Sequence, residues 1–219
     1  MTDVQGALLT ESVHRRIREE ILSGALPPGA PLSVPALAAR LEVSRSPVRE
    51  SVQQLFHEGL AVHTPRAGAR VATLDDETMR AVLQVREVLD GLAAGQAAAR
   101  ATLADVAGLR RLLEEQEGHL ASPADQRRDA ELDLAFHTTV RSLAGNAPLS
   151  AALLRLDTQA HLHRSDMWAH DLDRRLALAE HRLIVERIEA GDVVGAEAAA
   201  RAHVAGILVR LSRRPAAPA

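Results

Sequence analysis

The sequence predicts a mainly α-helical protein in two parts: an N-terminal part of three helices and a β-hairpin, and an all-α antiparallel bundle. Three observations carry this prediction. Apolar residues recur at helical spacing over most of the 219 residues, and alternating runs are confined to residues 60–73. Short breaks rich in Gly, Pro, Asn and Asp divide the helical remainder into segments of helix length. We expect the first part to cover residues 1–74, the bundle residues 75–212, and a disordered tail residues 213–219.

The N-terminal part begins with an amphipathic helix that ends at a turn over residues 23–29. The apolar positions of this helix are Val13, Ile17, Ile21 and Leu22. A short second helix follows, with Ser33 as its N-cap. The residues expected to face inward from it are Leu37, Ala38 and Leu41. Further along, alternating runs at residues 60–64 and 69–73, joined by residues 65–68, predict a hairpin.

The segment Val43–Glu50 predicts a third helix suited to a DNA groove. Ser44 is a favourable N-cap, and Pro47 lies in the first turn, where its missing N–H breaks no helical hydrogen bond. Arg45 and Arg49 share a polar face near the helix N-terminus, and one arginine paired with guanine discriminates between bases by roughly 1–3 kcal/mol. The alternative is an ordinary surface helix. The order helix, helix, turn, helix, hairpin instead predicts a winged helix-turn-helix.

From residue 75 onward the chain is predicted to be helical, without an alternating strand pattern. Acidic residues at 75–77 favour a helix start because they complement the positive end of the helix dipole. Six helices are expected, at about residues 76–99, 103–121, 123–144, 148–169, 172–190 and 192–212. The first of them is rich in alanine over residues 82–99, which allows a neighbouring helix to approach closely.

A group of potential metal ligands lies within the predicted bundle. Asp133 and His137 are four residues apart, so both project from one face of a helix. His181 and His203 lie on the fifth and sixth bundle helices. One carboxylate and three imidazoles suit Zn²⁺, Ni²⁺ or Mn²⁺, with positions left for water or a ligand. The alternative is that each histidine is solvated or hydrogen-bonded in a purely structural role.

Composition excludes some classes of protein. The chain has no cysteine, so neither a disulfide framework nor a thiolate metal site is possible. No apolar run approaches the ~20 residues of a membrane span, and we expect a cytoplasmic protein. The formal net charge is −3, and residues 1–75 contain as many acidic residues as arginines. DNA binding would therefore depend on a local basic face and would weaken as salt is added.

The N-terminal part resembles the DNA-binding domain of GntR-family transcriptional regulators. The segments that carry the resemblance are Leu26–Gly29, Ser44–Glu50, Glu58–Leu60 and Val71–Ala72. The resemblance implies that the recognition helix and the wing contact an operator, at the matching residues Arg45, Ser46, Arg49, Arg66 and Gly68. The chain departs from the family at Glu42, where Gly is common. We therefore expect a left-handed backbone at Glu42, at a cost of about 1 kcal/mol.

The bundle resembles the FCD domain, the effector-binding half of the FadR-type subfamily of these regulators. The matching motifs are Asp133-Leu-Ala-Phe-His137, Glu180-His181-Arg-Leu-Ile184 and Ala202-His203-Val204. The resemblance implies a divalent metal ion that helps to hold a small effector, often an organic carboxylate. Arg86 matches the family's effector-facing arginine, and its alternative role is to pair with Glu87 or Asp90. A bundle of six helices, rather than seven, is similar to the VanR-like group.

Together the two resemblances imply a ligand-responsive transcription factor, a repressor more readily than an activator. Because helix-turn-helix proteins usually bind two half-sites of double-stranded DNA, we expect a homodimer. One alternative is a regulator in which the metal is structural or is itself the signal. Another is a metal-dependent hydrolase, which would lack an evident additional base. We therefore predict a regulator and not an enzyme.

Overall fold

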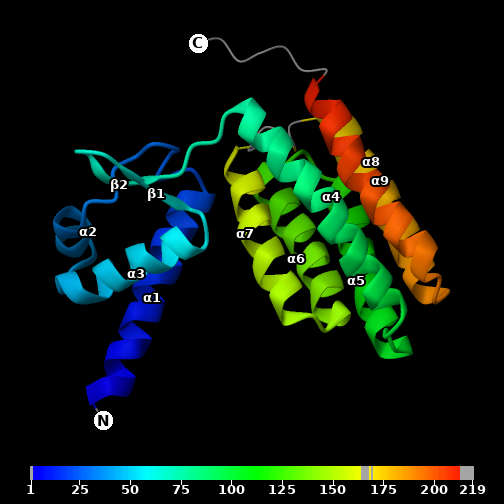
Figure 1. Ribbon diagram of the computed structural model, residues 1–219, viewed down its shortest axis with the longest axis horizontal. Coiled ribbons are helices and arrows are strands. Elements are labelled where there is room, and N and C mark those ends of the chain that lie inside the picture. The colour runs from blue at the N-terminus through cyan, green and yellow to red at the C-terminus, as the bar shows by residue number, and fades with distance from the viewer. Residues whose placement is uncertain (1, 164–167, 169, 213–219) are drawn as a thin grey trace. The chain divides into compact units, whose positions relative to one another are not determined.

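The computed structural model describes residues 2–163, Trp168 and residues 170–212 (Figure 1). The predicted tail at residues 213–219 lies outside this part of the chain, as does most of the expected helix beyond His163. The described chain forms two compact units. One comprises the residues up to Asp75 together with residues 158–163, and the other comprises the remaining residues from Asp76 onward.

The N-terminal unit is a winged helix-turn-helix. Its elements are α1 (Thr2–Leu22), α2 (Val34–Leu41), α3 (Arg45–His57), β1 (Ala61–Thr64) and β2 (Gly68–Val71). The apolar positions predicted from helical spacing meet in one core, whose members include Val13, Ile17, Ile21, Leu37, Ala38, Leu41, Val48, Val52 and Leu55. Leu22, the last residue of α1, is an exception and is 37% exposed. Burial of one face of each helix against the others therefore holds this unit together.

The hairpin is anchored to the turn that follows α1. The two strands are antiparallel, with Ala61 opposite Val71. The amide of Val71 donates a hydrogen bond to the carbonyl of Ala30 (2.9 Å), and the amide of Leu32 donates to the carbonyl of Ala69 (2.9 Å). The segment before α2 thus pairs with β2 and fixes the base of the wing.

The turn between α2 and α3 adopts the strained backbone expected from its sequence. Glu42 has φ 57° and ψ 39°, in the left-handed region, and this prediction is confirmed. Ser33 caps α2, since its hydroxyl oxygen accepts a hydrogen bond from the amide of Ala36 (3.5 Å). The hydrogen bond expected from a first-turn amide to the Ser44 side chain is absent. Ser44 occupies the N-cap position of α3 with an extended backbone, but its side chain makes no capping hydrogen bond.

The six helices expected after residue 75 are all present within the described residues, and they belong to the C-terminal unit except for the end of the fourth, at residues 158–163. They are α4 (Asp76–Ala98), α5 (Leu103–Leu120), α6 (Gln126–Ala144), α7 (Ala147–His163), α8 (Asp171–Glu189) and α9 (Val193–Ser212). Helix α6 begins later than residue 123 because the Asp125 side chain caps it, accepting from the amides of Arg127 (3.1 Å) and Arg128 (3.2 Å). No helix in the described ranges is long and apolar enough to cross a membrane.

The small residues of α4 bring α9 close to it. A β-carbon at Gly91 would lie 2.6 Å from a side-chain carbon of Arg201, and one at Gly95 would lie 3.3 Å from the carbonyl oxygen of Val193. Helix α4 also packs on α6, while α8 packs on α9 and α5. This arrangement brings α6, α8 and α9 around one interior.

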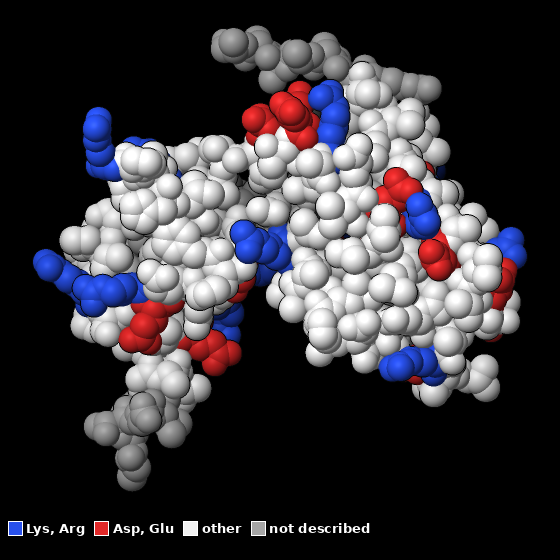
Figure 2. Space-filling model, viewed as in Figure 1, with Lys and Arg blue, Asp and Glu red and all other residues white. Residues whose placement is uncertain are grey.

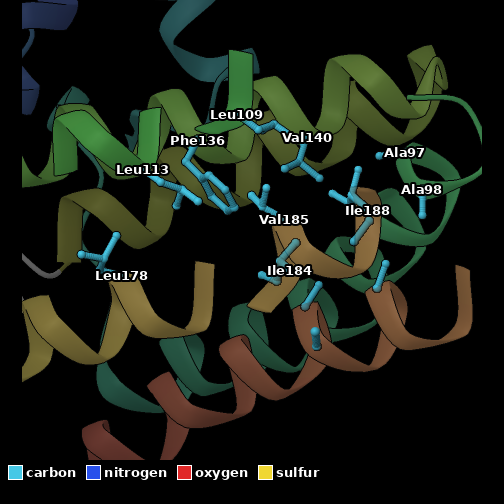
Figure 3. Packing of buried hydrophobic residues seen from close by; sticks show 14 residues of the cluster. Ala97, Ala98, Leu109, Leu113, Phe136, Val140, Leu178, Ile184, Val185 and Ile188 are labelled. Carbon is cyan, nitrogen blue, oxygen red and sulfur yellow. The ribbon is translucent and has the colours of Figure 1, made fainter. Parts of the chain in front are cut away.

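The core of the bundle is formed by apolar side chains that converge between these helices (Figure 3). Phe136 and Val140 extend from α6, and Ile184 and Ile188 extend from α8 toward them. Phe136 is fully buried. Because such side chains are close-packed, the helices that carry them have fixed positions relative to one another.

Replacing the strained residue of the turn should stabilise the N-terminal unit. We expect Glu42→Gly to raise the free energy of unfolding by about 1 kcal/mol, because glycine adopts the left-handed conformation without a Cβ penalty. The matched control is Glu11→Gly, at an exposed position in the middle of α1, which should instead lower the free energy of unfolding by roughly 1 kcal/mol. Urea unfolding followed by circular dichroism measures both. Equal destabilisation by the two variants would contradict the strain at Glu42.

Candidate metal centre and nucleic-acid interface

Helix α3 presents the predicted DNA-contacting residues on its exposed face. Arg45, Ser46 and Arg49 are all exposed, whereas the opposite face of the helix is buried. The hydroxyl of Ser46 donates a hydrogen bond to Glu50 Oε1 (3.1 Å), and Thr10 donates to the other oxygen of Glu50 (3.0 Å). Ser46 is thus held by an acidic neighbour, while the two arginines are placed to meet a phosphate or a base edge.

The wing presents one exposed arginine and holds another in place. Arg66 lies at the tip of the hairpin with φ 64° and is exposed, and Gly68 beside it has φ 75°. Arg70 is half-buried, and its guanidinium donates to the carbonyl of Gly29 (2.7 Å). Figure 2 shows separate basic groups on the N-terminal unit with acidic groups beside them, not one continuous basic surface. On this face, the positive charge is therefore local.

The predicted metal ligands meet in the interior of the bundle. We call this group the His/Asp cluster; its members are Asp133, His137, His181 and His203. One potential ligand atom from each residue lies within 4.8 Å of those of the other three. Asp133 and His137 are one turn apart on α6, His181 comes from α8 and His203 from α9. All four residues are buried, at 6% exposure or less.

The geometry of the cluster is that of three imidazole rings around one carboxylate. Asp133 Oδ1 lies 3.6 Å from His137 Nε2 and 3.5 Å from His181 Nε2. The ring centres of His181 and His203 are 4.8 Å apart. Phe136 stacks on the ring of His181, with centres 4.0 Å apart and planes inclined by 18°. This stacking fixes the orientation of one histidine ring within the core.

Two side chains outside the cluster orient its histidines. His181 Nδ1 lies 3.1 Å from Gln116 Oε1, and His203 Nδ1 lies 2.8 Å from Glu180 Oε2. Because both partner atoms are acceptors, each Nδ1 carries the proton and each neutral ring keeps its lone pair on Nε2. The Nε2 atoms of His181 and His203 are buried and have no hydrogen-bond partner among the described residues. Unpartnered imidazole nitrogens beside a carboxylate fit a divalent metal ion.

Sequence reasoning did not identify Gln116 or Glu180. Glu180 precedes His181 in the chain, but its carboxylate contacts the histidine of the next helix. Nothing in the local pattern signals this, because the contact exists only once α8 and α9 pack. A glutamate next to a candidate ligand is the only hint that the sequence offers.

The interior shifts the pKa values of the histidines in different directions. Burial lowers the pKa of His181 well below its ordinary value, and burial also lowers that of His203 despite its hydrogen bond to Glu180. Burial acts in the same direction on His137, but the charge and hydrogen bond of Asp133, together with the charge of Asp90, outweigh it and raise the pKa of His137. His181 and His203 are therefore neutral near pH 7, the form in which imidazole binds metals.

Arg86 is buried beside the cluster in a network of charges. Its guanidinium lies 3.1 Å from Asp90 and 2.9 Å from Asp157, and Arg141 also pairs with Asp157. Burial acts to lower the pKa of Arg86, but the charges of Asp157 and Asp90 outweigh it and raise that pKa. The pairing with Asp90 considered from the sequence is thus present, although inside the bundle and not on its surface. The two arginines and two aspartates compensate one another.

A small cavity connects this network to the His/Asp cluster. It has a volume of about 10 Å³, and its lining includes Asp90, Arg141, His137 and His203. That volume is close to the space that one water molecule needs. On the other side of the cluster, a cavity of about 20 Å³ is lined by Asp133, His181 and Trp168, among others. Neither cavity holds an organic acid without movement of the surrounding side chains.

The proteins similar to this chain are bacterial transcriptional regulators. The model of "Bacterial regulatory proteins, gntR family" matches residues 9–71, and that of the FCD domain matches residues 81–206. The chain is 33% identical over 189 residues to the "Probable D-xylose utilization operon transcriptional repressor" of Paenarthrobacter nicotinovorans, covering 86% of this chain and 82% of that protein. The solved structure of E. coli McbR/YncC has the same fold, with a TM-score of 0.78 at 21% identity, covering 94% of this chain and 97% of that one.

The winged helix-turn-helix and the helical domain that follows it define a DNA-binding transcriptional regulator. The chain belongs to the GntR family and carries an FCD domain. Regulators of this family act on DNA and are not enzymes, which removes the metal-dependent hydrolase from consideration.

Removing Arg86 should destabilise the bundle strongly. We expect Arg86→Ala to lower the free energy of unfolding by about 3–5 kcal/mol, because two buried carboxylates lose a compensating charge. The control is Arg111→Ala on the exposed face of α5, which should change stability by less than about 0.5 kcal/mol. Denaturant unfolding monitored by circular dichroism gives both values. If Arg86→Ala is as stable as the control, the network does not hold the bundle together.

Proposed function

We propose that this protein is a ligand-responsive repressor that binds operator DNA as a homodimer and releases it when a small organic acid binds in the bundle. The observation that carries the proposal is the buried His/Asp cluster, with two unpartnered imidazole nitrogens, in a chain that also has a DNA-binding unit. Because its target is the chromosome, we place the protein in the cytoplasm.

The DNA contacts come from the recognition helix and the wing. We assign them to Arg45, Ser46, Arg49, Arg66 and Gly68. The exposed position of the two α3 arginines and of Arg66 supports this assignment. Ser46 would have to exchange its hydrogen bond with Glu50 for one to the operator. Two copies of the chain would contact two half-sites, so that the symmetry of the dimer matches that of the operator.

The four members of the His/Asp cluster are the residues that would hold a divalent metal ion, with Zn²⁺, Ni²⁺ and Mn²⁺ as candidates. A bound cation would supply positive charge that attracts an anionic effector. The residues of the chain do the remaining work: they present neutral imidazoles, exclude bulk water and keep Asp133 next to two of the rings.

The effector site includes Arg86. Its guanidinium would pair with a carboxylate both without an effector and with an organic acid bound. Its guanidinium is paired with Asp90 and Asp157, so an organic carboxylate would replace one of these partners. The space beside the cluster is about 10 Å³, so binding requires the surrounding helices to move apart. This movement is how an effector could favour one arrangement of the DNA-binding units over another.

The second candidate is a regulator in which the metal is structural or is itself the signal. Two observations favour it: the four ligand atoms already lie within 4.8 Å of one another, and the cavity beside them, at about 10 Å³, is too small for an organic acid. The two candidates differ in whether an acid adds anything to the effect of the metal.

Metal binding can be followed through the only tryptophan of the chain, Trp168, which lines a cavity with Asp133 and His181. We expect Ni²⁺ to quench the tryptophan fluorescence of chelator-treated protein and to raise its melting temperature. Asp133→Ala should weaken this binding at least tenfold, because it removes a ligand. Glu131→Gln, at an exposed position of the same helix, is the control and should bind like the wild type. Equal binding by all three proteins would place the metal elsewhere.

The effector is sought by measuring melting temperature with a panel of mono-, di- and tricarboxylic acids. The expected result is that one acid stabilises the protein further, only when metal is present, and releases it from DNA. Stabilisation by metal with no added effect of any acid would support the second candidate instead. An acid that acts equally in the presence of a chelator would show that the effector does not need the metal.

Operator binding should depend on the arginines of α3. With a duplex selected from a random pool, we expect Arg49→Ala to weaken binding roughly 5- to 150-fold, the range of about 1–3 kcal/mol for a base contact. Arg111→Ala in the bundle is the control. It removes one positive charge, as Arg49→Ala does, and should bind DNA almost as the wild type does. Fluorescence anisotropy at two salt concentrations measures both. Equal weakening by the two variants would point to net charge and not to a contact from α3.

A further inference from the structure

Glu180 is engaged on both sides by groups from α9. One carboxylate oxygen lies 2.8 Å from His203 Nδ1. The guanidinium of Arg210 donates to both oxygens, at 2.8 Å and 3.1 Å. An ionised carboxylate is thus clamped between an arginine and a buried imidazole.

The backbone of α9 leaves room for this clamp at Gly206. A β-carbon at that position would lie 2.9 Å from Glu180 Oε1 and 3.3 Å from Arg210 Nη1. His203, Gly206 and Arg210 are three and four residues apart, so they lie along one face of the helix. A side chain in place of Gly206 would push the carboxylate away from its partners.

The two supporting groups of the cluster differ in charge. Gln116 is a neutral acceptor for His181, whereas Glu180 is an anionic acceptor for His203. A carboxylate on Nδ1 fixes the tautomer and the ring orientation and makes Nε2 a stronger electron donor. Arg210 keeps that carboxylate in place, since its planar guanidinium matches both oxygens.

We propose that Glu180, held by Arg210 in the space left by Gly206, is a positioning residue that fixes His203 as a metal donor and sets the metal affinity of the cluster. This inference rests on the proposed function, because it assumes that the His/Asp cluster binds a divalent metal. Glu180 touches neither the metal nor the effector. It acts only through the ring of His203.

The test measures the dissociation constant for Ni²⁺ by competition with a chromophoric chelator, in the full-length protein. We expect Glu180→Leu to bind roughly 10- to 100-fold more weakly than the wild type, and Gly206→Ala to be weakened in the same direction. Glu180→Gln, which keeps an acceptor but loses the charge, should be intermediate. The control is Glu117→Gln, an exposed glutamate of α5 paired with Arg182, which should bind like the wild type.

A second measurement separates positioning from a loss of folding. Imidazole ¹⁵N chemical shifts of the metal-free protein report which ring nitrogen carries the proton. We expect His203 to be protonated on Nδ1 in the wild type and to become a mixture of tautomers in Glu180→Leu, with the circular dichroism spectrum unchanged. If the wild type binds Ni²⁺ and the Glu180 variants bind it equally well, the positioning role is overturned. If the wild type binds no metal at all, the proposed function fails first.

Discussion

Three histidines and one aspartate meet inside the bundle, and the packing of α6, α8 and α9 depends on their meeting. Each of these residues is at most 6% exposed, so bulk water cannot solvate its side chain. Polar groups buried without partners cost several kcal/mol, of the order of 2–7 for an amide or hydroxyl. The helices therefore keep a register in which Asp133 lies beside two of the rings and the Nδ1 atoms of His181 and His203 have acceptors, although the Nε2 atoms of these two histidines have no hydrogen-bond partner among the described residues. The stacking of Phe136 on His181 and the hydrogen bonds that His181 and His203 donate to Gln116 and Glu180 maintain that register.

Buried charges also need partners of opposite sign, which explains why arginines and aspartates are paired around the cluster. Arg86 and Arg141 are buried, and each pairs with Asp157, while Asp90 is the other partner of Arg86. Such a network is stable only as long as its charges stay paired. In the function proposed above, an organic acid enters this network by exchange with one of the aspartates, and a stable interior would then also respond to a ligand.

Much of the site follows from local spacing, and the rest does not. Asp133 and His137 could be paired from the sequence because four residues make about one helical turn. The roles of Gln116 and Glu180 could not, since each contacts a histidine on another helix. The burial of Arg86 was equally hidden, because a lone arginine in a helix is usually on the surface.

The sequence by itself determined the winged helix-turn-helix, the six bundle helices and the left-handed turn at Glu42, because helical periodicity, turn residues and backbone sterics act over a few residues. It also named the four residues of the His/Asp cluster. Only the tertiary structure decided that their side chains lie within 4.8 Å of one another. That outcome depends on the crossing of three helices and on the close approach of α9 to α4, and contacts between residues distant in the chain control both.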